Sequence, residues 1–204
     1  MRLDHLAIAC RDLWAGCDWA QAALGVPFGP GGRHARFGTH NRLLGLGPDL
    51  YLEVIAPDPD AAPFEGPRWF GLDTPPPVPR LANWIVAVAD MDAARAVADP
   101  DTGPPIDLAR GDLTWRLTVP KDGHLPHGGG APTLIEWGAG SRHPAATLPD
   151  SGVRLRRLEV MHPDADALRD RYVPLRADPR IAWVTGAVPG LRATFDTPDG
   201  PRSF

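Results

Sequence analysis

The chain has 204 residues, of which 43% are hydrophobic and 23% are charged, and its formal net charge is −4. This composition excludes a largely disordered chain, and no apolar run reaches the roughly 18 residues that a membrane-spanning helix needs. The arginines are scattered rather than clustered, which argues against a nucleic-acid partner. No secretory leader precedes the first strand pattern, and reduced thiols are expected at Cys10 and Cys17, so we expect a cytoplasmic protein.

The first 57 residues predict one strand, one helix and three further strands. An apolar segment at 3–10 ends before Asp12, whose side chain can cap a helix. Helical spacing of apolar residues then continues over 13–24 until Gly25 stops it. Strand-forming residues fill three later segments, at 33–37, 39–46 and 50–56. We interpret residues 1–57 as a first βαβββ module.

The same order restarts after a proline-rich connector at 58–80. A strand pattern at 81–89 meets Asp90 and a short helical stretch at 91–98, and further strands are predicted at 113–119 and 133–137. An offset of 78 residues places Asp90 on Asp12 and Asn83 on His5. We interpret residues 81–140 as a second βαβββ module, in which Glu136 occupies the position that Glu53 has in the first module.

Residues 141–204 contain a third, partial echo of the module. Leu155 and Asp164 repeat the spacing of Leu3 and Asp12, and strands are predicted at 181–185 and 191–195. The predicted fold is therefore α+β, with paired βαβββ modules that form a curved mixed sheet around a central cavity, plus a C-terminal partial module.

Strand alternation suggests where a site could lie. Residues two apart share a face of a strand, so His5 is predicted to lie with Leu3 and two small alanines, while the bulkier Leu6 and Ile8 face the other way. The same reasoning places Asn83, Glu53 with Tyr51, and Glu136 on the concave face. A carboxylate within an apolar strand is costly unless a cation or strong donors meet it. The two carboxylates therefore predict either a bound ion or pairing with arginines such as Arg116.

Several segments resemble the glyoxalase-like domain family of the vicinal oxygen chelate superfamily. They are LDHLAIACRDL, GTHNRLLGLG, YLEVIAP, LANWIVAV, PTLIEW and LEVMHPDADAL. The resemblance implies a divalent metal site on His5, Glu53 and Glu136, holding Zn, Mn, Ni or Fe. Asn83 stands where many members have a further ligand, which implies weakened metal binding and a contact with substrate instead.

The remaining candidates depend on the same resemblance and on the strand faces. His40 is predicted to assist proton transfer, because the resemblance includes its THN segment. Asn41, Tyr51 and Arg116 are predicted to contact the substrate, with Arg116 able to hold an anion. A glycine-rich segment at 121–130 is predicted to form a mobile rim over the pocket. His143 and His162, each before a proline, are predicted to serve turns or caps.

Two functions remain open from the sequence. The first is a metal-assisted enzyme, a lyase, isomerase or dioxygenase-like protein acting on a small oxygen-rich or carbonyl-containing molecule. The second is a metal-free protein that binds or sequesters a small molecule in the same cavity. Exposed sheet edges also predict a possible homodimer.

Overall fold

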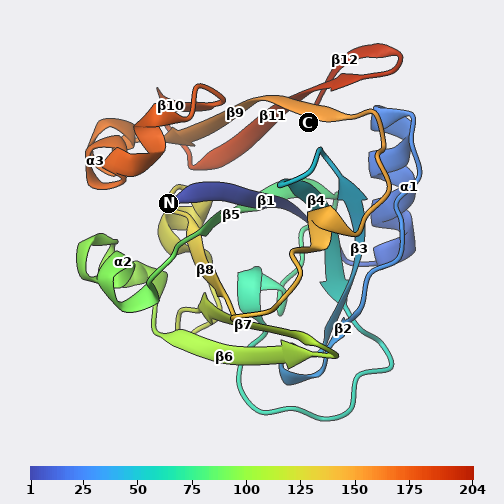
Figure 1. The fold of residues 1–204 in the computed structure, drawn as a ribbon, viewed down its shortest axis with the longest axis horizontal. Coiled ribbons are helices and arrows are strands. Elements are labelled where there is room, and N and C mark those ends of the chain that lie inside the picture. The colour runs from blue at the N-terminus through green and yellow to red at the C-terminus, as the bar shows by residue number, and fades with distance from the viewer.

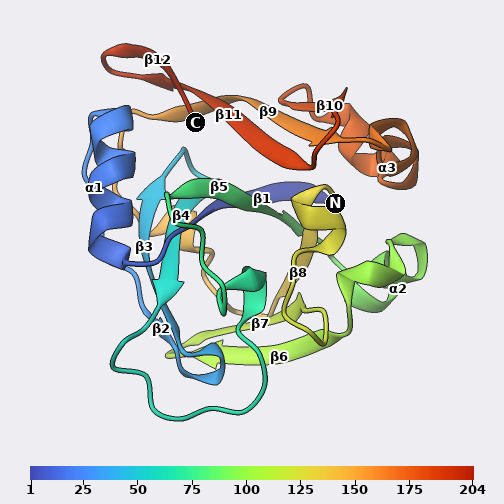
Figure 2. The ribbon, with the colours of Figure 1, turned by 180° about the vertical axis from the view of Figure 1, so that it is seen from behind.

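A computed structural model describes residues 1–204 and contains two β-sheets (Figure 1). Eight strands in the order β2-β3-β4-β1-β5-β8-β7-β6 form a strongly curved sheet. Four strands in the order β10-β9-β11-β12 form a second sheet, which lies across the convex side of the first in both ribbon views (Figures 1 and 2). None of the helices has the length and apolar character that crossing a bilayer requires.

The first module has the predicted order of elements. It consists of β1 (Arg2–Ala9), α1 (Leu13–Leu24), β2 (Arg33–His34), β3 (Thr39–Gly45) and β4 (Tyr51–Pro57). Helix α1 begins where the Asp12 side chain accepts a hydrogen bond from the Ala15 amide at 2.8 Å. It ends at Gly25, whose φ of 76° is the left-handed conformation that glycine adopts without strain. Cys17, on this helix, and Cys10 are both buried free thiols.

The second module repeats the arrangement with one strand that the sequence pattern missed. It consists of β5 (Arg80–Ala87), α2 (Met91–Val97), β6 (Pro105–Arg110), β7 (Leu113–Thr118) and β8 (Thr133–Trp137). The missed strand is β6, which starts at a proline and lies at the edge of the sheet, where a missing amide donor is tolerated. Antiparallel pairing of β1 with β5 joins the modules, which confirms the predicted curved sheet.

The C-terminal unit consists of β9 (Arg154–His162), α3 (Ala165–Arg171), β10 (Ile181–Thr185), β11 (Gly190–Thr197) and β12 (Gly200–Ser203). Its order of elements matches the other modules, but its strand pairing differs. Strand β9 has β10 as its parallel neighbour, whereas β1 has β4, the last strand of its module. The unit therefore forms a separate small sheet.

The two faces of the curved sheet bury different kinds of side chain. On the convex face, Leu6, Ile8 and Trp84 belong to a large apolar cluster that includes Leu158 and Phe195 of the second sheet. This burial against the second sheet and helix α1 stabilises the arrangement. The concave face has a smaller apolar cluster and surrounds the cavity described below.

Candidate functional site

A β-bulge in β1 places two titratable side chains next to each other. Leu3 pairs with Val86 and His5 pairs with Ile85, so Asp4 is an extra residue in the ladder. Such a residue changes the direction of its neighbours' side chains. Leu3 therefore packs into the convex core, while His5 faces the concave side. The prediction that Leu3 and His5 share a face is wrong for this reason.

Asp4 is completely buried and accepts hydrogen bonds from three rings. Its Oδ1 lies 2.7 Å from Nδ1 of His5, and its Oδ2 lies 3.0 Å from both Nε2 of His143 and Nε1 of Trp137. Burial alone would raise the pKa of Asp4, but the bonds from His143 and His5 outweigh it and hold the pKa well below its usual range. The buried carboxylate is therefore ionised and fixes the orientation of the His5 ring.

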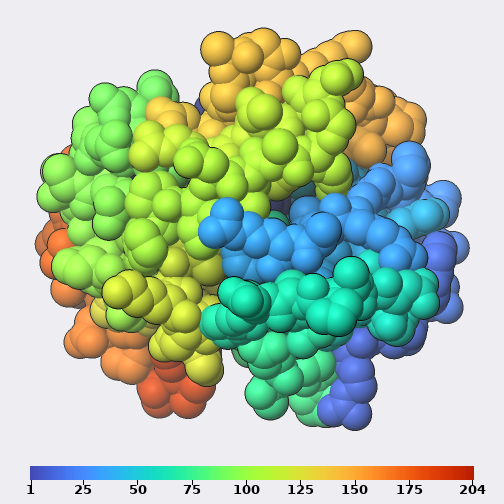
Figure 3. Space-filling model, turned by 90° about the horizontal axis from the view of Figure 1, so that it is seen from below, coloured from blue at the N-terminus to red at the C-terminus, as the bar shows by residue number.

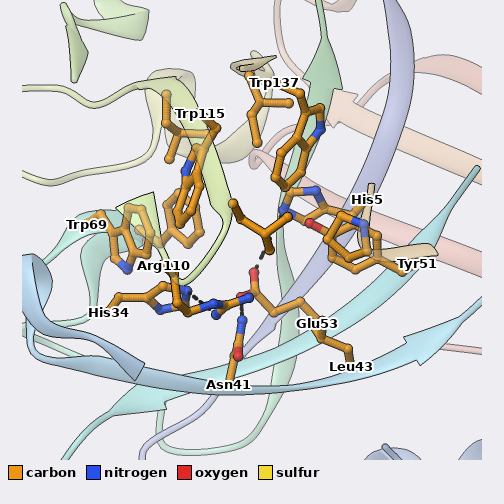
Figure 4. A pocket seen from close by; sticks show the side chains of 15 residues that line it. His5, His34, Asn41, Leu43, Tyr51, Glu53, Trp69, Arg110, Trp115 and Trp137 are labelled. Carbon is orange, nitrogen blue, oxygen red and sulfur yellow. Dashed lines mark hydrogen bonds and ion pairs between the residues drawn. The ribbon is translucent and has the colours of Figure 1, made fainter. Parts of the chain in front are cut away.

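His5 and Glu53 meet inside the concave cavity, as Figure 4 shows. Because Nδ1 of His5 bonds to Asp4, Nε2 faces Glu53, at 3.8 Å from Oε2. The other carboxylate oxygen, Oε1, accepts a hydrogen bond from Nδ2 of Asn41 at 2.5 Å. Tyr51 stacks on the His5 ring with centroids 4.3 Å apart. The structure therefore brings His5, Glu53, Asn41 and Tyr51 together, as the sequence predicted.

The second module contributes an apolar half to this cavity. Ile85 pairs with His5 across the centre of the sheet, and Ile135 pairs with Ala87 as Glu53 pairs with Ala7. Ile85 and Ile135 both belong to the apolar cluster of the concave face. Aromatic side chains complete the wall, namely Trp69, Phe70, Trp115 and Trp137. The cavity measures about 40 Å³, room for a few water molecules or a ligand of a few heavy atoms.

His34 and Arg110 also line the cavity. Nη1 of Arg110 lies 3.2 Å from Nε2 of His34, and a guanidinium can only donate. Nε2 therefore accepts, and Nδ1 of His34 donates to the Thr39 hydroxyl at 3.2 Å. Burial, and then the positive charge of Arg110, lower the pKa of His34 to about 3. At neutral pH this imidazole is uncharged.

The neutral His34 makes stability depend on pH in a defined window. Its pKa is about 3 when folded and 6.5 when exposed, so the unfolded chain takes up the proton first as the pH falls. The contribution of neutral His34 is complete above pH 6.5 and declines as the pH falls toward 3. We expect a His34→Gln variant to lose less stability than the natural protein between pH 6.5 and 4, measured by urea unfolding. Parallel losses in both proteins would contradict this assignment.

Glu136 and Arg116 lie outside the cavity, which corrects two predictions. In β8 the cavity side is taken by Ile135 and Trp137, so Glu136 points to the convex side. There its Oε1 accepts from the Met91 amide at the start of α2, at 3.1 Å, and its Oε2 pairs with Arg116 at 3.2 Å. The arginine pairing considered from the sequence is present, but on the outer surface.

Asn83 and His40 are also placed differently from their predictions. Asn83 is fully buried within the sheet, where Nδ2 donates to Thr133 at 3.0 Å and Oδ1 accepts from the Trp84 amide at 2.9 Å. Its side chain is thus occupied by structural bonds. His40 alternates with Asn41 on β3 and so lies on the outer face, with Nδ1 3.9 Å from Asp58. Neither residue lines the cavity.

The glycine-rich segment at 121–130 does not cover the cavity. The backbone carbonyl of Gly129 accepts a hydrogen bond from Nε1 of Trp84 at 3.1 Å, so the segment packs beside β5. The prediction that it forms a rim over the cavity is therefore wrong. His143 caps a short turn, because its Nδ1 accepts from the Ala145 amide at 3.3 Å. Nδ1 of His162 likewise accepts a hydrogen bond from the Asp164 amide at 2.9 Å, at the start of the following turn. His143 additionally reaches Asp4, a link that its position before a proline did not reveal.

The sequence reasoning missed Asp4, His34 and Arg110. Asp4 had a detectable signal, because it is a charged residue within an apolar strand directly beside His5. His34 was within a predicted strand but carried no distinguishing pattern. Arg110 ends β6, which had no predicted strand, so its proximity to His34, 76 residues away in the chain, was not foreseeable.

The predicted three-ligand metal site is not formed. Catalytic divalent-metal sites usually have three protein ligands with one open position. In this cavity His5 and Glu53 are the two candidate ligands, and nowhere in the chain do three or more His, Cys, Asp or Glu side chains converge suitably. The residues that β5 and β8 place on the concave face include Ile85 and Ile135, whose side chains have no ligand atoms. The donor set therefore does not fit the predicted ion.

Comparisons with known proteins give one family and a group of similar structures. The profile of the glyoxalase-like domain matches residues 3–176. No curated protein matches the chain. Methylmalonyl-CoA epimerase from Streptomyces coelicolor, in complex with 2-nitronate-propionyl-CoA, has 22% identity and a TM-score of 0.45, covering 68% of this chain and 99% of its own.

Two further structures extend this comparison. Methylmalonyl-CoA epimerase from Mycobacterium tuberculosis has 20% identity and a TM-score of 0.43, covering 67% of this chain and 86% of its own. A mutant of 4-hydroxymandelate synthase from Streptomyces coelicolor has 14% identity and a TM-score of 0.40, covering 71% of this chain and 51% of its own.

Proposed function

Because this chain belongs to the glyoxalase-like domain family, we propose that it is an enzyme that transfers a proton at a carbon next to a carbonyl group of a small molecule. The family spans several chemistries, so the proposal depends on the site. One observation carries it: buried Asp4 holds His5 so that Nε2 faces Glu53 inside a largely apolar cavity. An oriented imidazole beside a carboxylate is the arrangement that general base catalysis uses.

The proposed step uses only side chains of this chain. Nε2 of His5 accepts the proton from the substrate carbon, and the electron pair of the broken C–H bond forms the carbon–carbon double bond of an enolate. Asp4 and Glu53 stabilise the imidazolium that results, since opposite charges favour the protonated form. Return of the proton to the other face of the same carbon completes an epimerisation. Where that carbon carries a hydroxyl group, return of the proton to the neighbouring carbon and transfer of the hydroxyl proton to the other oxygen complete an isomerisation, with no gain or loss of atoms.

The apolar half of the cavity supports the same chemistry. Side chains such as Trp115, Ile135 and Trp137 surround the His5–Glu53 pair and leave a space of about 40 Å³. Exclusion of bulk water strengthens the electrostatic interactions of the base and protects a reactive enolate. An ion at this point would have two protein ligands, His5 and Glu53, and the proposed step uses these side chains without an ion.

A second candidate function is binding without turnover. The feature that favours it is the pair Ile85 and Ile135, which makes half of the site suited to holding apolar groups rather than to chemistry. The discriminating property is exchange of carbon-bound hydrogen with solvent, which only the enzyme would promote.

The experiment is hydrogen–deuterium exchange followed by nuclear magnetic resonance in D₂O. Protein treated with a chelator is incubated with a panel of small carbonyl compounds, including pyruvate and methylglyoxal, with and without added Mn²⁺, Ni²⁺ or Zn²⁺. We expect enzyme-dependent exchange of a carbon-bound proton in the chelated sample. Binding without exchange would favour the second candidate, and exchange that appears only with an ion would overturn the metal-free mechanism.

The two glutamates provide a direct test of which carboxylate belongs to the site. We expect Glu53→Gln to lower the exchange rate by at least about tenfold, because the charge beside His5 is lost. Glu136→Gln should leave the rate unchanged, since that carboxylate lies on the outer surface with Arg116. The measurement is the exchange rate at saturating substrate. Equal losses in the two variants would show that the cavity assignment is incorrect.

A further inference from the structure

We propose that Arg110 is the anion receptor of the cavity and that the ligand is a small monocarboxylate. This inference rests on the proposed function, because it places the carboxylate of the substrate opposite His5. It depends on four features of the Arg110 side chain, which are its position, its unpaired charge, the glycine beside it and the size of the space around it.

Arg110 lies where the two edges of the curved sheet approach each other. It is the last residue of β6, one edge strand, and its hydrogen bond to His34 reaches β2, the other edge strand. A second arginine crosses the same seam, since Arg36 donates to the Asp107 carbonyl at 3.3 Å. In Figure 3 the surface is hollowed between the yellow-green strand β6 and the blue segment around β2. Arg110 therefore lies between the solvent and the interior of the cavity.

The charge of Arg110 has no partner in the protein. Its hydrogen bond goes to Nε2 of His34, and no Asp or Glu forms an ion pair with it. The imidazole of His34 is neutral at pH 7, because burial and Arg110 lower its pKa to about 3. Guanidinium groups have five N–H donors, so most of those on Arg110 remain free for a ligand. In a partly buried site, an uncompensated cation of this kind is costly and favours an anion.

Gly32 makes the space that the guanidinium occupies. A Cβ atom at this position would lie 2.6 Å from Nη1 and 2.9 Å from Cζ of Arg110. The Gly32 amide also donates to Oδ1 of Asn41 at 2.7 Å, which fixes the backbone beside the cavity. The first module is thus shaped to admit an arginine from the second module at the end of the site where Asn41 and Glu53 lie.

The chemistry of the site selects the class of anion. The planar fork of an arginine matches a carboxylate through two parallel hydrogen bonds. The cavity of about 40 Å³ admits only a few heavy atoms. Glu53 in the same cavity disfavours a doubly charged anion such as phosphate, because like charges repel. A small monocarboxylate whose carbon next to the carbonyl group faces His5 satisfies all three conditions.

The test measures binding of pyruvate, of its neutral amide pyruvamide, and of inorganic phosphate, by quenching of tryptophan fluorescence. Three tryptophans line the cavity and can report the ligand, namely Trp69, Trp115 and Trp137. We expect pyruvate to bind at least about tenfold more tightly than pyruvamide, because a charge-assisted bidentate pair is lost with the amide. Tighter binding of phosphate than of pyruvate would overturn the proposed ligand class.

Variants separate a receptor role from a structural one. Arg110→Gln should remove the preference for pyruvate, and Arg110→Lys should retain a part of it, because lysine keeps the charge but not the fork. Arg36→Gln is the matched control, since it loses a contact across the same seam outside the cavity. An Arg110→Gln protein that folds with an unchanged melting temperature and still prefers pyruvate would overturn the proposal, as would an equal loss in the Arg36→Gln control.

One further variant distinguishes this inference from the proposed function. His5→Gln should bind pyruvate as the natural protein does while losing hydrogen exchange. Arg110-dependent binding without exchange in the natural protein would leave the receptor role intact and refute the enzyme. Hydrogen exchange that is unchanged in the Arg110→Gln variant would support the enzyme and refute the receptor role of Arg110.

Discussion

Replacing His5 by glutamine is expected to lower the turnover number for carbon–hydrogen exchange by about 10²- to 10⁴-fold, the usual contribution of a positioned general base. Glutamine has a similar size and can still donate to Asp4, so the buried carboxylate keeps a partner. It cannot accept a proton from carbon at neutral pH. The measurement is the exchange rate at saturating substrate, together with the Michaelis constant, which should change little.

His40→Gln is the matched control for this substitution. His40 is a strand histidine of the same module, but it lies on the outer face near Asp58. We expect its exchange rate to equal that of the natural protein, because no cavity contact is lost. If His5→Gln retained most of the activity, or if His40→Gln lost as much, His5 could not be the base.

Replacing Asp4 by alanine is expected to lower the free energy of unfolding by about 3–5 kcal/mol, as for other buried charges removed from their partners. The substitution leaves three ring donors without their common acceptor, those of His5, His143 and Trp137. Unsatisfied buried donors are costly because they have also lost their bonds to water. Urea unfolding followed by circular dichroism measures the difference, and Asp122→Ala, at an exposed carboxylate, is the control.

The effect of Asp4 should depend on pH with a definite sign. Hydrogen bonds hold the folded pKa of Asp4 below its ordinary value of 3.8, despite the opposing effect of burial. The folded chain therefore releases this proton more readily than the unfolded chain, and the carboxylate stabilises the fold fully above pH 3.8. That stabilisation is lost as the pH falls below 3.8 through the lower folded value. The difference in free energy of unfolding between the natural protein and the Asp4→Ala variant should decrease as the pH falls through that range. A difference that stays constant would refute the assignment of a lowered pKa to Asp4.

The duplicated modules could be predicted because their signals are local. Asp12 and Asp90 each accept a hydrogen bond from an amide three residues later, which starts a helix whatever the rest of the chain does. Alternation of apolar residues likewise belongs to each strand separately. These signals also placed His5 and Glu53 correctly, since each lies in a strand whose bulky residues pack against the opposite side.

The second half of the site could not be predicted in the same way. The alternation of side chains along a strand shows which residues share a face, but it does not show which face becomes concave. Glu136 and Arg116 were therefore grouped correctly with their neighbours and assigned to the wrong side. The bulges at Asp4 and Ala82 are themselves 78 residues apart, so Asn83 remains the counterpart of His5, but its side chain bonds to Thr133 within the sheet and does not line the cavity.

The sequence by itself determined the order of elements, the capping of the first two helices and the presence of an imidazole and a carboxylate in one module. Only the tertiary structure decided that Asp4 orients His5 and that an apolar half faces the pair. It also decided that Arg110 meets His34 across the two edges of the sheet. The reason is physical, because caps and alternation depend on neighbours in the chain, whereas curvature, bulges and closure depend on pairing between strands far apart in sequence.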